Sequence, residues 1–349
     1  MGTLGGYRKY RSKERYTHYL LLQEATQVTY TLDTYRSGVL DGARQWADLN
    51  PEERRRRAVL AAQHLDMVAL WSLTEAHTLL YGHAGGTLSP RTARAYREGV
   101  NRLTNYAAQT GMGLIRPERD AGPLYTRTLE TAGLAPSSVR VHLAAARTLF
   151  RALRWAGVAQ LDPFSDTKPA KDKTAPWDKR QPYLEPEVAA LLEAAGPRDR
   201  ALILLCAHAG LRIAEALALT WSDLDGPSLV VQHGKGGKLR RVDCSATLQA
   251  ALQAVQRSSQ PDGKTVDPAS PVIGATQGSA RERLQALARR AGVPYRGWHA
   301  FRHYAGTRLV TQTGNLEHAA RHLGHASIET TRIYAKWSDR ALSDAIAGW

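Results

Sequence analysis

The stretch LGHASIETTRIY spans residues 323–334 and places a histidine and a tyrosine on either side of a predicted helix start. Gly324 predicts the end of one helix, because glycine adopts the left-handed cap conformation at little cost. Ser327 predicts the N-cap of the next helix. His325 is therefore expected in the joint between the two helices, and Tyr334 on the second of them. Packing of a half-buried tyrosine would account for this stretch if it stood alone.

Two basic residues lie upstream in settings that also allow a simple structural role. Arg212 follows a predicted helix break at Gly210 in a mainly apolar neighbourhood, where a buried charge needs a partner. A salt bridge to Glu215 would provide that partner. Lys235 lies in the glycine-rich segment 232–238 between two predicted short strands, where an ordinary surface turn is the simplest interpretation.

The segment HAFRH at residues 299–303 places His299, Arg302 and His303 on one side of a helix turn. These residues could form a polar cap over the core. The i, i+4 spacing of the two histidines is also that of a zinc-binding helix. However, Ala300 stands where a metalloprotease motif has its glutamate, and the sequence offers no clear third ligand. We therefore expect no metal, and the absence of a P-loop pattern predicts no nucleotide cofactor.

The order and spacing of these groups resemble the catalytic signature of the tyrosine recombinases, the phage-integrase family. The matching set is Arg212, Lys235, His299, Arg302, His325 and Tyr334. The tyrosine follows the last histidine by nine residues, and that histidine follows the second arginine by 23. No single motif is specific for this family, but the match of six positions in order and spacing is. The resemblance is strong over about 180–347 and weaker over 80–165, and the first 75 or so residues have no counterpart.

The resemblance implies a role for each residue of this set. Arg212 and Arg302 would hold the scissile phosphate with forked, permanently charged donors. His299 would take the proton of the attacking tyrosine, and Lys235 would protonate the leaving 5′-oxygen. His325 would hydrogen-bond the phosphate, and the tyrosine that ends the opening stretch would be the nucleophile. Such assistance is needed because a tyrosine hydroxyl has an ordinary pKa of about 10 and is rarely ionised at neutral pH.

The composition indicates a polyanionic partner. Lysine and arginine number 47 against 32 acidic residues, which gives a formal charge of +15 and a pI of about 10.0. Nucleic acid is the commonest partner of such a chain. No apolar run is long enough to span a bilayer, and the basic N-terminus lacks an apolar signal core. The two cysteines predict neither a disulfide framework nor a cysteine zinc site. We therefore expect a cytoplasmic protein that does not contact a membrane.

The expected fold is mainly α with a small antiparallel sheet (α+β). Residues 1–78 are interpreted as a helical N-terminal extension of unknown role, and 79–165 as a helical core-binding domain that contacts DNA. The proline-rich segment 166–182 reads as a linker. Residues 183–349 would form the mixed α/β catalytic domain of a tyrosine recombinase, with a C-terminal tail helix.

Capping signals predict several helix starts. They are Asn50-Pro51, Ser89-Pro90, Pro136-Ser137 and a Ser279/Glu282 capping box. The first of these helices is expected to continue to Trp71. Residues 185–195 and 199–209 predict two further helices, with helix resuming over 211–217. Residues 229–231 and 239–242 predict the two strands of a hairpin.

One face of the helix after Pro136 is strongly basic. This face carries Arg140, Arg147, Arg151 and Arg154. Residues 81–165 as a whole contain eleven arginines against five acidic residues. We therefore predict that this face contacts DNA phosphates.

These features together predict a site-specific recombinase that cuts and rejoins double-stranded DNA through a 3′-phosphotyrosine and a Holliday junction. It would act as a homo-tetramer at synapsis, or with a paralogous recombinase. A type IB topoisomerase shares this chemistry but works as a monomer, and the apolar stripe of the tail at 337–349 speaks against it. A DNA-binding regulator that lost catalysis is a further alternative, which the intact six-residue set opposes. The target site and the biological setting, whether resolution of chromosome dimers or integration of a mobile element, are not predicted.

Overall fold

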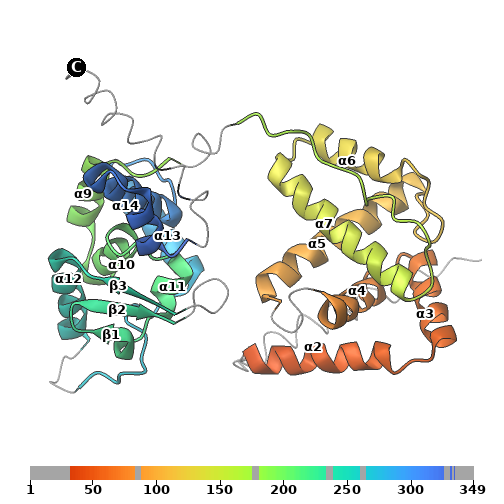
Figure 1. Cartoon of the computed structure of the whole chain (residues 1–349), viewed down its shortest axis with the longest axis horizontal. Coiled ribbons are helices and arrows are strands. Elements are labelled where there is room, and N and C mark those ends of the chain that lie inside the picture. The colour runs from red at the N-terminus through yellow and green to blue at the C-terminus, as the bar shows by residue number, and fades with distance from the viewer. Residues whose placement is uncertain are drawn as a thin grey trace, which may run out of the picture. The chain divides into compact units, whose positions relative to one another are not determined.

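The computed structural model describes residues 32–82, 88–174, 181–232, 239–259, 265–325, 331 and 334. The chain divides into two compact units, Met1–Asp172 and Lys173–Trp349, which are described separately below (Figure 1). No helix among these residues is both long enough and apolar enough to cross a bilayer.

The described part of the N-terminal unit is helical. Its main elements are α2 (Leu32–Ala47), α3 (Pro51–Gln63), α4 (Met67–Tyr81), α5 (Pro90–Thr110), α6 (Ala121–Thr131) and α7 (Pro136–Trp155). Helix α7 packs against both α4 and α5, and buried side chains from Ala43 to Phe164 form one hydrophobic cluster. The boundary expected after residue 78 falls within α4, and residues on both sides of it contribute to this cluster. The described helices before residue 78, α2 and α3, therefore pack as part of this unit.

The first predicted helix begins where expected but is shorter. Asn50 is the N-cap of α3, and its Oδ1 accepts a hydrogen bond of 2.9 Å from the backbone of Glu53. The helix does not continue to Trp71. Leu65 has a left-handed φ of +50°, and the Asp66 carboxylate accepts from the backbone amides of Val68 and Ala69 in the first turn of α4. A side-chain cap of this kind stabilises a new helix start, so the chain forms two helices here instead of one.

The C-terminal unit combines helices with one small sheet. Its helices are α9 (Glu185–Ala194), α10 (Pro197–Ala207), α11 (Ile213–Ala218), α12 (Ala246–Ser258), α13 (Gln277–Arg290), α14 (Trp298–Thr313) and α15 (Leu316–Leu323). Strands β1 (Leu224–Asp225), β2 (Ser228–Val231) and β3 (Arg240–Asp243) form an antiparallel sheet in the order β1-β2-β3. The pairing of Leu229 with Val242 and of Val231 with Arg240 is that of the predicted hairpin. A mainly α fold with a small antiparallel sheet is thus confirmed.

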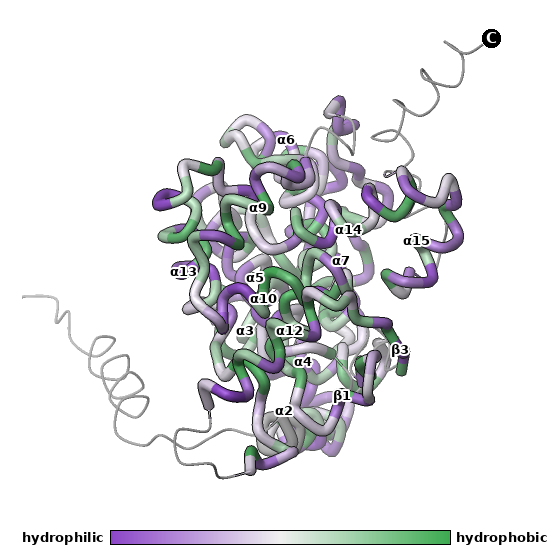
Figure 2. The backbone as a smooth tube through the Cα atoms, turned by 90° about the vertical axis from the view of Figure 1, so that its left-hand side faces the viewer, coloured by the Kyte–Doolittle hydropathy of each residue, from purple (hydrophilic) through white to green (hydrophobic). Residues whose placement is uncertain are grey.

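Helix α10 forms the middle of the C-terminal unit. Residues 201–207 are all buried, and the helix packs against α12 and α14. The tube beside the α10 label in Figure 2 is green, the colour of hydrophobic residues. A helix that is apolar on every side must be covered by neighbours. It also contacts α11, the helix that follows it along the chain.

The start of α13 differs slightly from the prediction. The helix begins at Gln277, and its N-cap is Thr276, whose hydroxyl accepts from the backbone of Ser279 at 3.1 Å. Ser279 is thus the third residue of the helix and not its cap. Both residues are good capping types, and Thr276 has the extended backbone of an N-cap, with φ −83° and ψ 161°.

Candidate active site

A break between two helices places Arg212 at the start of α11. Gly210 adopts a left-handed φ of +63°, which an L side chain rarely adopts, and the chain then turns into α11 with Arg212 as its N-cap. The Arg212 backbone amide donates to Glu215 Oε2 at 2.9 Å, and Nη1 donates to Oε1 at 2.8 Å. The salt bridge considered from the sequence is therefore present.

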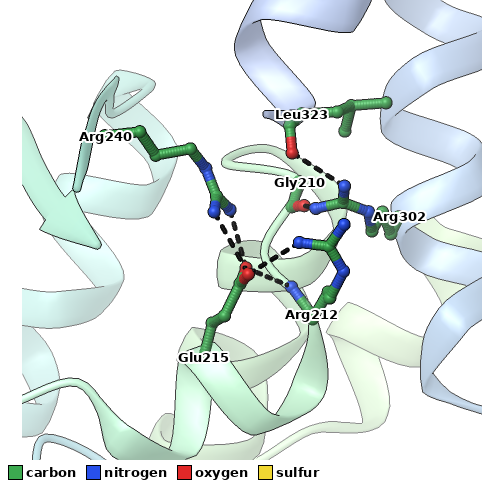
Figure 3. Close-up of polar contacts among 6 residues, drawn as sticks. All are labelled: Gly210, Arg212, Glu215, Arg240, Arg302 and Leu323. Atoms are coloured by element: carbon green, nitrogen blue, oxygen red, sulfur yellow. Dashed lines mark hydrogen bonds and ion pairs between the residues drawn. The ribbon is translucent and has the colours of Figure 1, made fainter. Parts of the chain in front are cut away.

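The same carboxylate binds a second arginine, which comes from the sheet. Arg240, the first residue of β3, donates from Nη1 to Glu215 Oε1 at 3.1 Å and from Nη2 to Oε2 at 2.6 Å (Figure 3). Burial alone would raise the pKa of Glu215. The hydrogen bonds from Arg240 and Arg212 outweigh this effect and lower the pKa to about 2. Glu215 is therefore ionised at neutral pH and balances part of the positive charge around it.

Arg302 is held at the centre of the unit by two backbone carbonyls. Its side chain is almost completely buried, with 1% of the residue exposed, and it projects from α14. Nη1 donates to Gly210 O at 2.5 Å, and Nη2 donates to Leu323 O at 2.7 Å (Figure 3). Burial, together with the nearby charge of Arg212, lowers the pKa of Arg302 to about 10, so the guanidinium is still charged at neutral pH. These contacts join α14 to the helix break and to the end of α15.

His325 follows the predicted helix end. Gly324 is the C-cap of α15 with a left-handed φ of +66°, as the sequence indicated. His325 Nδ1 lies 3.0 Å from the hydroxyl of Thr331. Burial lowers the pKa of His325 to about 4, and the charges of Arg302 and Arg212 act in the same direction. The imidazole is therefore neutral at neutral pH.

Tyr334 is enclosed by residues of its own chain. Only 2% of the residue is exposed, and it belongs to a small hydrophobic cluster with Ala305, Val310, Ala319 and Leu323. Its ring stacks at 6.1 Å from the ring of His325 and lies 5.7 Å from that of His303, measured between centroids. Burial raises the pKa of Tyr334 to about 12, although Arg302 and Arg212 act in the opposite direction. The hydroxyl is therefore protonated until a reaction partner or base changes its surroundings.

The histidine pair on α14 lies beside this tyrosine. His299 is exposed, His303 is buried, and their rings meet at 4.6 Å in an edge-to-face arrangement. The buried ring thus contacts both the exposed histidine and Tyr334. Over the described part of the chain, no three histidine, cysteine or acidic side chains are grouped so that they could hold a metal ion. The zinc interpretation of this pair therefore gains no third ligand.

Five of the six candidate residues lie in one region of the C-terminal unit. The charges of Arg302, Arg212, His299 and Arg240 all act on His325, and those of Arg302 and Arg212 also act on Tyr334. Lys235, Ser327 and the tail at 337–349 lie outside the described residues. The arrangement joins two guanidiniums, a neutral imidazole and a buried tyrosine hydroxyl. Such a group can hold a phosphodiester and present an oxygen nucleophile to it.

Comparison with known proteins decides the family. A sequence model of the phage integrase family matches residues 184–340, and one of the phage integrase N-terminal SAM-like domain matches residues 84–157. Tyrosine recombinase XerC of Xanthomonas campestris pv. campestris is 32% identical over 257 residues, which cover 71% of this chain and 79% of that protein. The chain belongs to the phage integrase family of tyrosine recombinases. XerC of Chromohalobacter salexigens is 29% identical over 286 residues, with coverage of 76% and 91%.

Solved recombinase structures share the fold of this tyrosine recombinase. The post-cleavage complex of XerH with a palindromic difH substrate has a TM-score of 0.58 at 18% identity and covers 88% of this chain and 93% of that one. A lambda integrase dimer bound to a COC′ core site has a TM-score of 0.58 at 16% identity, with coverage of 75% and 76%. At these identities the likeness concerns the fold.

Three residues of the candidate active site were not singled out as site residues by the sequence. Arg240 had no visible signal, because its contact with Glu215 joins residues 25 positions apart. Thr331 lies within the opening stretch but carries no motif. His303 was noted only as part of a polar cap or a metal pair, and a helix-face argument alone does not say which of two histidines meets the tyrosine.

The predicted basic face of the N-terminal unit separates into two kinds of arginine. Arg140 and Arg151 are exposed. Arg147 donates from Nε to Phe164 O at 2.8 Å and from Nη2 to Thr167 O, and Arg154 lies 3.5 Å from the Asp162 carboxylate. Arg147 therefore holds the segment after α7 in place, whereas Arg154 is exposed like Arg140 and Arg151 and only pairs with this segment. A helical wheel cannot separate them, because the loop that they bind comes later in the sequence.

Proposed function

We propose that this tyrosine recombinase cuts and rejoins double-stranded DNA at a specific site, with Tyr334 as the nucleophile of a 3′-phosphotyrosine intermediate. One observation carries the proposal. A buried tyrosine from the end of the chain lies in the same unit as Arg212, Arg302 and His325, and the charges of both arginines act on it. The chain can therefore supply both the nucleophile and the phosphate-binding groups of one active site.

The two arginines suit the charge that develops on the phosphate. The guanidinium of Arg302 has five N–H donors, and its two carbonyl contacts use one hydrogen on each of Nη1 and Nη2. Those contacts fix its position while leaving further donors for the non-bridging oxygens. Arg212 would supply a second set. Each such donor typically contributes about 3–4 kcal/mol of transition-state stabilisation.

His325 would hydrogen-bond the same phosphate as a neutral ring. When the Thr331 hydroxyl donates to Nδ1, the proton of the neutral imidazole lies on Nε2. That N–H is then a donor for a phosphate oxygen. Because the ring stacks on Tyr334, the histidine donor and the nucleophile would reach the same phosphate group.

The proton of Tyr334 needs an acceptor, because burial holds the pKa of the hydroxyl far above neutral. We propose His299 as this base, as the family resemblance implies. The ring of His303 contacts both His299 and Tyr334, so the proposed base and the nucleophile lie on the same side of α14. Lys235 would protonate the leaving 5′-oxygen. The phosphotyrosine conserves the energy of the broken bond, so rejoining requires no nucleotide cofactor.

The N-terminal unit would bind the duplex through α5 and α7. Together these two packed helices carry eight arginines and one acidic residue, Glu98. A surface of this kind releases counterions from the DNA backbone, which gives affinity without sequence preference. We propose that residues 79–165 form the core-binding part of the protein, with 1–78 as its extension, 166–182 as the linker and 183–349 as the catalytic part. Both parts would contact the duplex on either side of the DNA bond that is cut.

Strand exchange through a Holliday junction requires four active sites, so we propose a tetramer at synapsis. The partner subunits would be copies of this chain or of a paralogous recombinase. The XerH structure is of a site-specific recombinase bound to a difH substrate, and the lambda integrase structure is of a dimer bound to a core site. These relatives support recombination over the monomeric topoisomerase alternative.

Covalent trapping tests the proposed function. Footprinting of trapped protein on genomic DNA would first locate the site. A nicked suicide substrate of that site should then form an adduct at the 3′ end, because the short cleaved fragment diffuses away with the 5′-hydroxyl needed for reversal. Mass spectrometry should place the nucleotide on Tyr334. Tyr334→Phe should bind the DNA and form no adduct.

The controls are Tyr304→Phe and Tyr295→Phe, two tyrosines near the histidine motif. Both variants should still form the adduct. An adduct on either control residue, or one that survives in Tyr334→Phe, would overturn the assignment. Equal trapping on unrelated duplexes would instead favour a topoisomerase.

A further inference from the structure

Arg240 lies between two parts of the proposed active site. Its side chain is 14% exposed, and its guanidinium forms a two-armed ion pair with Glu215, at 2.6 and 3.1 Å (Figure 3). The stem of the side chain lies against Gly324. A Cβ atom on that glycine would lie 2.6 Å from Arg240 Cδ and 3.0 Å from Nε. Gly324 directly precedes His325, so Arg240 contacts both the partner of Arg212 and the segment that carries the histidine.

Two arginines share the two oxygens of Glu215. Arg240 binds each oxygen with a separate nitrogen, whereas Arg212 uses its backbone amide and Nη1. A carboxylate and a guanidinium prefer the forked geometry with two parallel hydrogen bonds. Arg240 already occupies that geometry. The carboxylate is therefore unable to form a second fork with Arg212.

This sharing has a consequence for phosphate binding. If Arg240 were absent, Glu215 could turn both oxygens to the guanidinium of Arg212. That pair would use donors that the phosphate needs, and it would leave less net positive charge beside the phosphate. A carboxylate that lacks its second cation would also repel the phosphate directly.

We infer that Arg240 is a positioning residue that holds Glu215 and so keeps Arg212 available to the scissile phosphate. The inference rests on the proposed function, in which Arg212 binds that phosphate. Arg240 itself does not contact the DNA in this arrangement, because its side chain is largely buried and two of its nitrogens are taken by Glu215. Its loss should therefore slow cleavage without weakening DNA binding.

Single variants test whether Arg240 acts as a positioning residue. Arg240→Met should form the Tyr334 adduct about 10- to 100-fold more slowly, the range found for residues that support other catalytic groups. Its Kd for the site should change less than about twofold. Arg240→Lys should be intermediate, because an ammonium cannot bind both oxygens in a fork. The matched control is Arg241→Met, the next residue, whose exposed side chain pairs with Asp225 at 2.7 Å. It should cleave at the wild-type rate.

A double variant separates positioning from simple loss of structure. In Arg240→Met/Glu215→Gln the carboxylate charge is removed together with its partner, so no unpaired buried charge remains. A neutral amide cannot capture the Arg212 guanidinium as an ion pair. This double variant should therefore form the adduct about tenfold faster than Arg240→Met, although it carries one more substitution, as expected for coupled residues.

The rates and affinities of these variants decide between the alternatives. A double variant as slow as Arg240→Met, or slower, would overturn the inference, as would wild-type cleavage by Arg240→Met. A large loss of DNA affinity in Arg240→Met would assign the residue to direct phosphate contact and also overturn it. If the wild-type protein forms no adduct on Tyr334, the proposed function fails first and the inference falls with it.

Discussion

Gly306 of α14 lies directly against the ring of Tyr334. A Cβ atom at this position would be 2.6 Å from Cε2 and 2.7 Å from Cζ of the tyrosine, well inside normal contact distance. Any other residue at 306 would push the ring away from its present place. The missing side chain on α14 therefore creates the space that the tyrosine occupies beside His325.

The variant Gly306→Ala should separate stability from catalysis. Alanine is preferred over glycine inside a helix by about 1 kcal/mol, which offsets part of the cost of the clash. The midpoint of thermal unfolding should therefore change little. The displaced hydroxyl should react about 100-fold more slowly, because a shift of about 1 Å is enough for such a loss.

Adduct formation on the suicide substrate measures this effect, with DNA affinity measured in parallel. Thr311→Ala is the matched control, because this residue is exposed on the same helix. It should leave the rate unchanged. Wild-type adduct formation by Gly306→Ala would contradict the assigned role of the glycine.

The two candidate catalytic arginines should differ in their contribution to folding. Arg302→Met leaves the carbonyls of Gly210 and Leu323 without their buried donor, at about 1–3 kcal/mol each. Arg212→Met removes one guanidinium contact to Glu215, and its side chain is 31% exposed. We expect Arg302→Met to lower the midpoint of thermal unfolding clearly and Arg212→Met to lower it only slightly.

Both arginine variants should form the adduct slowly, because each loses a contact made in the transition state. Thermal unfolding and adduct formation should be measured on the same preparations. Equal losses of stability in the two variants would contradict the structural role of Arg302 that its carbonyl contacts indicate.

The sequence indicated the candidate catalytic groups but not all of the residues that hold them. Gly324, Asn50 and the hairpin were predictable because a cap or a turn depends on a few adjacent residues. Arg302 was placed on the correct helix, yet its contacts with Gly210 and Leu323 join distant parts of the chain. The same applies to Arg240, whose partner Glu215 lies on another element.

The basic face of α7 illustrates the same limit. Spacing alone placed four arginines on one face, but it could not indicate that Arg147 donates to the carbonyl of Phe164. The length of α3 was also misjudged, because a capping aspartate at 66 and a left-handed residue at 65 act against a continuous apolar pattern. Local signals therefore predict where elements begin better than what their side chains bind.

His325 should titrate at unusually low pH. Burial, with the charges of Arg302 and Arg212, lowers the pKa of its imidazole to about 4, against an ordinary value of 6.5. In the window between these values the unfolded chain binds a proton that the folded chain does not. The contribution of this residue to stability is therefore full above pH 6.5 and is lost as the pH falls toward 4.

The titration can be followed by the NMR signal of the His325 ring. We expect a midpoint near pH 4 in the wild type and a higher midpoint in Arg212→Met, which loses one of the repelling charges. Arg308→Met is the control, because the charge of this arginine acts on His208 instead. A His325 midpoint near 6.5 in the wild-type protein would contradict the buried, arginine-rich surroundings described here.

The salt dependence of DNA binding should separate the two kinds of arginine on α7. Arg140 and Arg151 are exposed, whereas Arg147 binds the carbonyls of Phe164 and Thr167. Each phosphate contact contributes about 0.9 to the slope of log K against log salt concentration. Arg140→Ala and Arg151→Ala should therefore each reduce this slope by about 1 and weaken binding on specific and unrelated duplexes alike.

Arg147→Ala should keep the wild-type slope but lower the midpoint of thermal unfolding, because two carbonyls lose their donor. Fluorescence anisotropy from 50 to 200 mM salt provides the slopes. A reduced slope in Arg147→Ala, or unchanged slopes in both of the other variants, would move the DNA contact to another face of the unit.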